Sequence, residues 1–123
     1  MEIEIIPKNL EVTEEEKNDI KEKVSSLEKF LKGISEYKVR VIIEKILPKE
    51  EDLGIVYIVE EILETPFERF VAKAKSFKLE LAVAEAKNEL KIQLEKFKEK
   101  IRAKERKGEI DLKNKIRGLD KES

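Results

Sequence analysis

Hydrophobic and polar positions alternate with two different periods along this chain, and the longest helical pattern covers residues 79–107. Neither Pro nor Gly interrupts it, while Ser76 is a candidate N-cap and Gly108 a candidate C′ residue. At about 1.5 Å per residue this helix would be roughly 45 Å long, so its last turns are expected to project beyond the core. The apolar stripe consists of Leu79, Val83, Ala86, Leu90, Leu94, Phe97 and Ile101.

A second, shorter helical pattern lies closer to the N-terminus. Thr13 and Glu16 have the spacing of a capping box, and the acidic residues 14–16 suit the positive end of a helix dipole. Gly33 is a natural C′ residue at which this helix would end. The side chains expected to be buried are Ile20, Val24, Leu27 and Leu31, with Phe30 and Ile34 beside them.

Four segments have the pattern of β-strands: residues 2–6, 37–47, 55–62 and 67–74. Pro7 is expected to end the first strand, and residues 48–54 to form a polar, acidic loop. The order β-α-β-β-β-α predicts an α+β fold with a four-stranded sheet, whose last three strands form an antiparallel meander. Both helices should pack on one face of the sheet. The other face would carry residues such as Ile42 and Ile58 and could serve as a partner surface.

The length and periodicity predict one folded domain over residues 1–107 and a flexible tail over residues 108–123. The longest apolar run, residues 55–59, is too short to span a membrane. The acidic N-terminus lacks the basic and apolar regions of a signal peptide. A cytoplasmic protein without a membrane partner is therefore expected.

The composition excludes most catalytic chemistry. The chain is 45% charged and 40% hydrophobic, with no Cys and no His. Thiolate nucleophiles, thiolate metal sites and the commonest general base and metal ligand are therefore missing. The glycines are isolated, so they form no phosphate-binding loop, and residues 48–54 lack the alternating ligands of an EF-hand. We expect a protein that is not an enzyme and binds no cofactor or metal.

Charge is distributed unevenly along the chain. Residues 73–107 carry 12 Lys and Arg against 6 Glu, whereas residues 1–72 carry 11 basic against 18 acidic residues. One helical stripe of cations could displace condensed counterions from a nucleic-acid backbone. It consists of Lys87, Lys91, Lys98 and Arg102, with Lys96, Lys100, Lys104 and Lys107 on another flank.

Two other interpretations of the long helix remain open. Glu85, Glu89, Glu95 and Glu99 interleave with the lysines, as in a solvated helix face with Glu–Lys pairs. The apolar stripe has near-heptad spacing, so Phe97 and Ile101 could instead contact a coiled-coil partner. A homodimer through the long helix or the second sheet face is the corresponding alternative.

Several short segments, in this element order, resemble the ribosome hibernation-promoting factors, also called ribosome-associated inhibitors or sigma-54 modulation proteins. The resemblance covers about residues 1–105. The first helix matches at its start in Leu10-Glu11-Val12-Thr13 and at its end in Leu27-Glu28-Lys29-Phe30. The second helix matches in Asn88-Glu89-Leu90 and Gln93-Leu94-Glu95-Lys96-Phe97-Lys98. The length is similar to that of the short family members, which lack a C-terminal dimerisation domain.

This resemblance implies a function in ribosome hibernation and the stress response. Family members bind ribosomal RNA of the small subunit with their helical face, and they inhibit translation by occluding the messenger and transfer RNA sites. Basic positions of the family match Lys23, Lys29 and Lys96. The implied RNA-binding set, including the helical stripe, is Lys23, Lys29, Lys87, Lys91, Lys96, Lys98 and Arg102.

The chain departs from the family pattern at three places. The second helix begins Lys78-Leu79-Glu80-Leu81-Ala82, without the usual tyrosine, and Ile92 occupies a position that is usually basic. The first helix is rich in acidic residues. A diverged protein-interaction or dimerisation module of the same fold, without ribosome binding, is therefore the alternative function.

Overall fold

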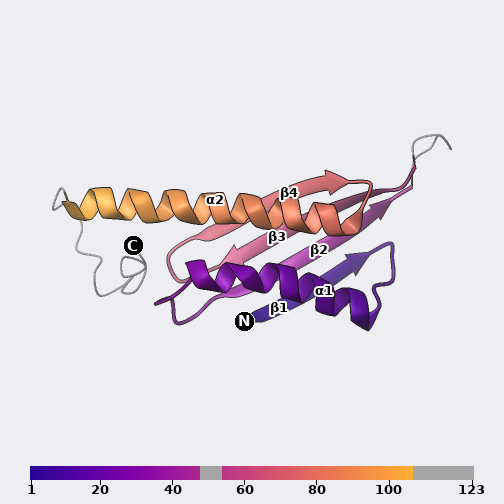
Figure 1. Cartoon of the computed structure of the whole chain (residues 1–123), viewed down its shortest axis with the longest axis horizontal. Helices are drawn as coiled ribbons and strands as arrows, with labels where there is room; N and C mark the ends of the chain where they lie inside the picture. The colour runs from indigo at the N-terminus through magenta and orange to yellow at the C-terminus, as the bar shows by residue number, and fades with distance from the viewer. Residues whose placement is uncertain (48–53, 107–123) are drawn as a thin grey trace.

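The computed structural model describes residues 1–47 and 54–106, with side chains up to residue 104. Residue 107, the predicted tail, Gly108 and most of the predicted acidic loop lie outside these residues. The predicted order β-α-β-β-β-α is confirmed, with one additional short 3-10 helix, η1 (Figure 1). The elements are β1 (Glu2–Lys8), α1 (Glu14–Ser25), η1 (Ser26–Phe30), β2 (Lys38–Ile46), β3 (Val56–Glu64), β4 (Arg69–Ser76) and α2 (Leu79–Arg106).

The sheet has the strand order β1-β2-β3-β4. Strands β2, β3 and β4 form the predicted antiparallel meander. Strand β1 pairs with β2 in parallel, with Ile3 opposite Val39 and Ile5 opposite Val41. A parallel pair needs a crossover connection, which α1 and η1 provide here.

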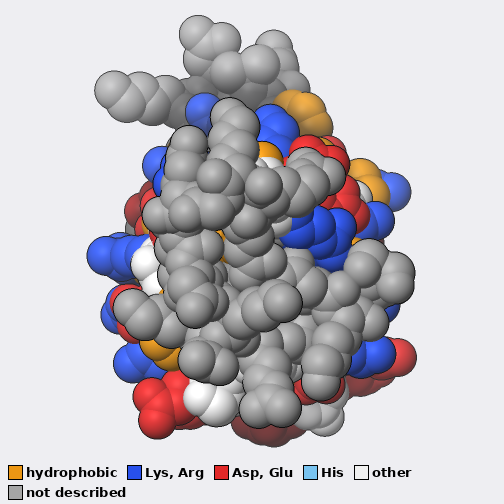
Figure 2. Space-filling model, turned by 90° about the vertical axis from the view of Figure 1, so that its left-hand side faces the viewer, with side chains coloured by type: hydrophobic (Ala, Val, Ile, Leu, Met, Phe, Trp, Pro, Cys, Tyr) orange, Lys and Arg blue, Asp and Glu red, His pale blue; other side chains and the backbone are white. Residues whose placement is uncertain are grey.

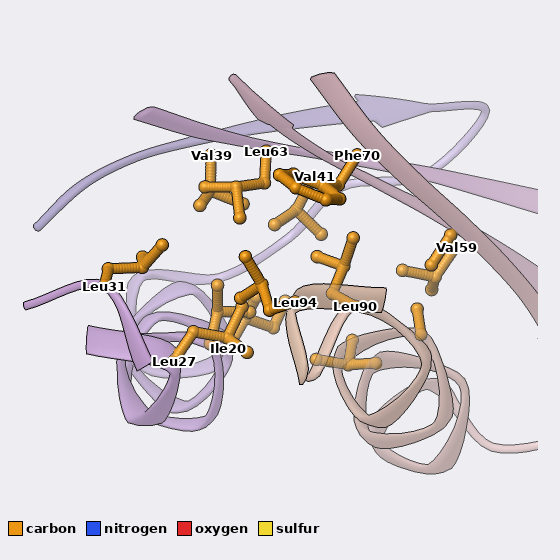
Figure 3. Packing of buried hydrophobic residues seen from close by; sticks show 14 of the residues in the cluster. Ile20, Leu27, Leu31, Val39, Val41, Val59, Leu63, Phe70, Leu90 and Leu94 are labelled. Carbon is orange, nitrogen blue, oxygen red and sulfur yellow. The ribbon is translucent and has the colours of Figure 1, made fainter. Parts of the chain in front are cut away.

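Both helices cover the same face of the sheet, as the hydrophobic pattern predicted. Val39, Val41 and Ile43 alternate along β2 and are fully buried. Figure 3 shows Ile20 and Leu27 from the first helical segment, and Leu90 and Leu94 from α2, pointing toward the sheet. These side chains form one continuous core that includes the whole predicted α2 stripe, with Leu79 and Phe97 at its margin.

The two helices run in the same direction, so their N-termini lie at one end of the molecule (Figure 1). Thr13 caps α1 with the predicted capping box: its hydroxyl accepts from the Glu16 backbone N, and the Glu16 carboxylate accepts from the Thr13 backbone N, both at 3.1 Å. The predicted first helix ends as the 3-10 helix η1, and Gly33 follows with a φ of 87°. Only Gly and a few polar residues adopt this conformation readily.

Several predicted boundaries were wrong, and β3 ends at Glu64 rather than at residue 62. Strand β1 continues through Pro7 to Lys8, because an edge strand tolerates a residue that cannot donate a hydrogen bond. Strand β4 spans Arg69–Ser76 rather than residues 67–74. Ser76 therefore ends this strand and does not cap α2; its hydroxyl accepts a hydrogen bond from the Lys78 backbone N at 3.2 Å.

The last turns of α2 extend past the sheet and α1, as predicted from its length (Figure 1). Phe97 and Ile101 nevertheless pack inward. The Phe97 ring meets that of Phe70 edge to face at 5.5 Å, and Ile101 is 4% exposed. These side chains therefore contribute to the core of the chain itself and are not left over for a coiled-coil partner.

Candidate nucleic-acid interface

The four cations of the predicted stripe lie on the flank of α2 that faces α1 and η1. Their spacing makes the four side chains point in nearly the same direction, since seven residues of a helix complete two turns to within about 20°. Lys87 lines a groove between α1 and α2 of about 680 Å³. Lys91 and Lys98 contact η1, and Arg102 follows one turn after Lys98.

A cluster of three ammonium groups surrounds one aromatic ring. The Nζ atoms of Lys29, Lys91 and Lys98 lie 5.3, 5.4 and 5.8 Å from the centre of the Phe30 ring. These are cation–π distances. Two residues come from η1 and two from α2, so helix packing brings them together. We refer to Lys29, Lys91, Lys98 and Phe30 as the Phe30 cluster.

The lysines of the Phe30 cluster differ in exposure. Lys29 is exposed, Lys91 is half-buried and Lys98 is only 8% exposed. Within residues 1–47 and 54–106, neither Lys29 nor Lys91 forms an ion pair with a carboxylate. The cluster therefore presents positive charge at the surface, while Lys98 has its stem inside the protein.

The groove between α1 and α2 changes sign along its length. Its lining includes two cations, Lys23 and Lys87. Toward the N-termini of both helices it is lined by carboxylates of Glu16, Asp19 and Glu80, while Glu22 lies next to Lys23 in α1. The part of the helical face that suits a polyanion therefore runs from Lys23 and Lys87 in the groove, past η1, to the C-terminal half of α2. In Figure 2, the end of the molecule at which α2 finishes shows Lys and Arg side chains interspersed with Asp and Glu.

One residue of the predicted RNA-binding set is separated from the others. Lys96 is exposed and lies about 200° around α2 from Lys98. It therefore shares the opposite flank with Lys100 and with Gln93, whose Nε2 donates to the backbone oxygen of Val71 on edge strand β4 at 2.9 Å. The remaining six residues, Lys23, Lys29, Lys87, Lys91, Lys98 and Arg102, lie on or beside the groove and the Phe30 cluster.

A buried carboxyl lies beneath this face. Glu61 on β3 is paired with Val41 and Ala72 on the neighbouring strands and is 0% exposed. Neither of its side-chain oxygens has a hydrogen-bond partner within the described part of the chain. Burial raises the pKa of Glu61 from 4.5 to about 8, and the positive charge of Lys87 partly opposes this shift. The carboxyl is therefore largely neutral at pH 7.

The sequence alone does not show that Phe30 contacts three lysines or that Glu61 is a buried carboxyl. The hydrophobic pattern places Phe30 only at the margin of the core, because a sequence does not show which cations an aromatic ring will contact. Glu61 did carry a signal: it falls between Val59 and Leu63, which share its strand face and are fully buried. That alternation places a carboxylate at a core position.

The α+β fold and the cationic part of the helical face together make a domain whose surface can hold a polyanion. Residues 3–102 match the family described as sigma 54 modulation protein / S30EA ribosomal protein. The chain belongs to this family, as its resemblance to the hibernation-promoting factors predicted.

Two of the solved structures that are similar to this chain illustrate the shared fold. The N-terminal domain of Protein Y from Thermus thermophilus is 21% identical with a TM-score of 0.65, and the match covers 79% of this chain and 99% of that one. A ribosomal subunit interface protein from Coxiella burnetii is 19% identical with a TM-score of 0.61, covering 80% of this chain and 98% of that one. No curated protein matches the sequence significantly.

Within residues 1–47 and 54–106, no group of three or more carboxylates is arranged to hold a metal ion. None of the helices in this part of the chain combines the length and the apolar character needed to cross a bilayer.

Proposed function

We propose that this protein binds the small ribosomal subunit and inhibits translation by occluding the sites of messenger and transfer RNA. The binding surface is the helical face at the Phe30 cluster, with Lys23 and Lys87 in the groove beside it and Arg102 beyond it. The proposal rests above all on one observation: three lysines from two helical elements converge on Phe30 in a member of a ribosomal protein family. One of the structural neighbours is itself a ribosomal subunit interface protein.

The mechanism requires no catalytic step. Lysine and arginine side chains contact backbone phosphates and release condensed counterions, which gives affinity without reading base sequence. A rigid domain held on the RNA in this way excludes other RNA from the same space. Such a protein would act in the cytoplasm, as a hibernation factor under stress.

Co-sedimentation with purified small subunits across a salt series tests the proposal. Binding should weaken steeply with salt, because each phosphate contact contributes roughly 0.7 to 0.9 to the slope of log K against log salt. Binding that is absent at low salt would exclude the ribosomal function. Affinity that hardly changes with salt would exclude the phosphate mechanism.

The variant Lys29→Glu/Lys91→Glu locates the binding surface. Both side chains are accessible, so the fold should remain intact, whereas affinity should fall at least about tenfold and the salt slope by about two. Lys98 is unsuitable for charge reversal. Because Lys98 lies off the apolar stripe, the sequence pattern predicts that Lys98→Glu leaves the fold intact. The side chain is only 8% exposed, however, so the new carboxylate would be largely buried.

A matched control is available on the same helix. Lys96→Glu/Lys100→Glu makes the same change in charge at exposed positions on the opposite flank of α2. If the Phe30 cluster carries the contact, this control should bind within about twofold of the wild type. Equal losses in both double variants would mean that only net charge matters, and a larger loss in the control would place the contact on the Lys96 flank.

The alternative function, a dimerisation module, is favoured by the uncovered sheet face. Val71 and Ile46 are 43% and 39% exposed there, with Val71 opposite Ile62 and Ile46 opposite Val56. Apolar association releases no phosphate counterions and should be insensitive to salt. Light scattering that detects a stable dimer, together with no binding to the subunit, would favour this alternative.

A further inference from the structure

We propose that Phe30 is a positioning residue, whose ring gathers Lys29, Lys91 and Lys98 into one phosphate-binding cluster. This inference rests on the proposed function, since it names the residue that organises the binding surface. A cation lying over an aromatic face is attracted by the ring quadrupole. One ring within 5.8 Å of three ammonium groups therefore favours an arrangement that flexible lysine side chains would otherwise rarely adopt.

The ring is held firmly enough to act in this way. Phe30 is half-buried and packs against the core at the end of η1. Its neighbour Leu31 and the facing Leu94 are each 1% exposed, so the backbone on both sides of the contact is fixed by tight packing. The ring that the three lysines contact is thus held in place by the folded core.

The two accessible lysines of the cluster can receive an anion. Within residues 1–47 and 54–106, Lys29 and Lys91 form no ion pair with a carboxylate. An RNA phosphate that approaches the exposed Lys29 and the half-buried Lys91 therefore contacts two cations at once. Preorganised cations lose less conformational entropy on binding than free surface lysines do.

Phe30→Leu and Phe30→Met test the role of the ring. Both variants keep an apolar side chain at the core margin and every positive charge, but they remove the quadrupole. We expect subunit affinity to fall about tenfold at low salt in both, while Phe30→Tyr, which keeps the ring face, should bind within about twofold of the wild type. Unfolding in denaturant identifies any variant whose loss of binding reflects loss of fold.

A measurement on the free protein separates this inference from the proposed function. In the wild type, ring currents should shift the ε-methylene proton resonances of Lys29, Lys91 and Lys98, and these shifts should disappear in folded Phe30→Met. Inorganic polyphosphate should perturb the same resonances in the wild type more strongly than in the variant. If polyphosphate does so but subunits do not bind, the cluster is real and the ribosomal function is wrong.

Three results would overturn the positioning role. The first is a folded Phe30→Leu or Phe30→Met variant that binds subunits with wild-type affinity and salt slope. The second is a wild-type protein whose lysine resonances show no ring-current shift, because the ammonium groups would then not lie over the ring in solution. Phe30→Tyr that binds as weakly as Phe30→Leu, while equally folded, would also contradict it.

Discussion

Among the side chains that the structure describes, two charged ones are buried, Glu61 at 0% and Lys98 at 8% exposure. Burying a charge without partners is costly, and the two residues meet this cost differently. Glu61 keeps its proton, because burial raises its pKa to about 8. Lys98 directs its ammonium group to the Phe30 ring and makes a further contact within the protein.

Glu61 should make stability depend on pH. Its pKa is about 8 in the folded protein and about 4.5 in the unfolded chain, so folding takes up a proton between these values. Stability should therefore fall as pH rises from about 4.5 to 8, by roughly 3 kcal/mol at pH 7. Glu61→Gln cannot ionise and should remove this part of the slope, as measured by denaturant unfolding at several pH values.

Glu60→Gln is the matched control for this experiment, because Glu60 lies on the other face of the same strand and is only half-buried. It should keep the wild-type dependence on pH between 5 and 8. A Glu61→Gln variant that keeps that dependence as well would show that another group is responsible for it.

At the scale of elements, the distribution of charge follows the direction of the two helices. Both N-termini lie at one end, where Glu14, Glu15, Glu16 and Glu80 occupy first turns. The cations gather toward the C-terminal parts, as helix dipoles favour. This arrangement stabilises each helix and, because the helices are parallel to one another, it also concentrates positive charge at one end of the helical face.

Thr13→Ala should destabilise the protein by about 1 kcal/mol, since it removes the side chain that caps α1. The Glu16 backbone N would lose its acceptor, and the capping box would keep only the bond from the Thr13 backbone N. Thermal unfolding measures the loss. Thr13→Ser keeps the hydroxyl and should retain most of the stability; an equal loss in both variants would indicate that the methyl group, and not the cap, is important.

At the scale of the molecule, the sheet separates two unlike surfaces. The helical face carries the Phe30 cluster and the groove. The open face carries apolar side chains beside a charged group in which Glu64 pairs with Arg40 at 3.0 Å and more loosely with Lys38 and Arg69 at 3.8 Å. A ligand of one face makes no contact with the other, so the two candidate functions can be tested separately.

Val71→Gln makes the open face more polar without changing its charge, at a position 43% exposed. If the helical face binds the ribosome, this variant should bind small subunits within about twofold of the wild type, because no phosphate contact is altered. Co-sedimentation checks this result, and light scattering follows the oligomeric state in parallel. Loss of subunit binding in Val71→Gln would place the interface on the open face instead.

The hydrophobic pattern predicted most of the fold because each signal is local. The α2 stripe from Leu79 to Ile101 and the capping box at Thr13 depend only on residues a few positions apart. Strand boundaries were less accurate. Whether Pro7 ends a strand depends on its position at the edge of the sheet, which the local sequence does not encode.

The element order, the buried helix faces and the row of cations from Lys87 to Arg102 could all be predicted from the sequence, because they follow from spacing along one chain. The same spacing places Lys96 on another flank of α2. Which cations meet across elements depends on the folded core, which brought Lys29 of η1 to the same ring as Lys91 and Lys98. The physical reason is that contacts between elements depend on how helices pack on a sheet, and packing is a property of the whole core.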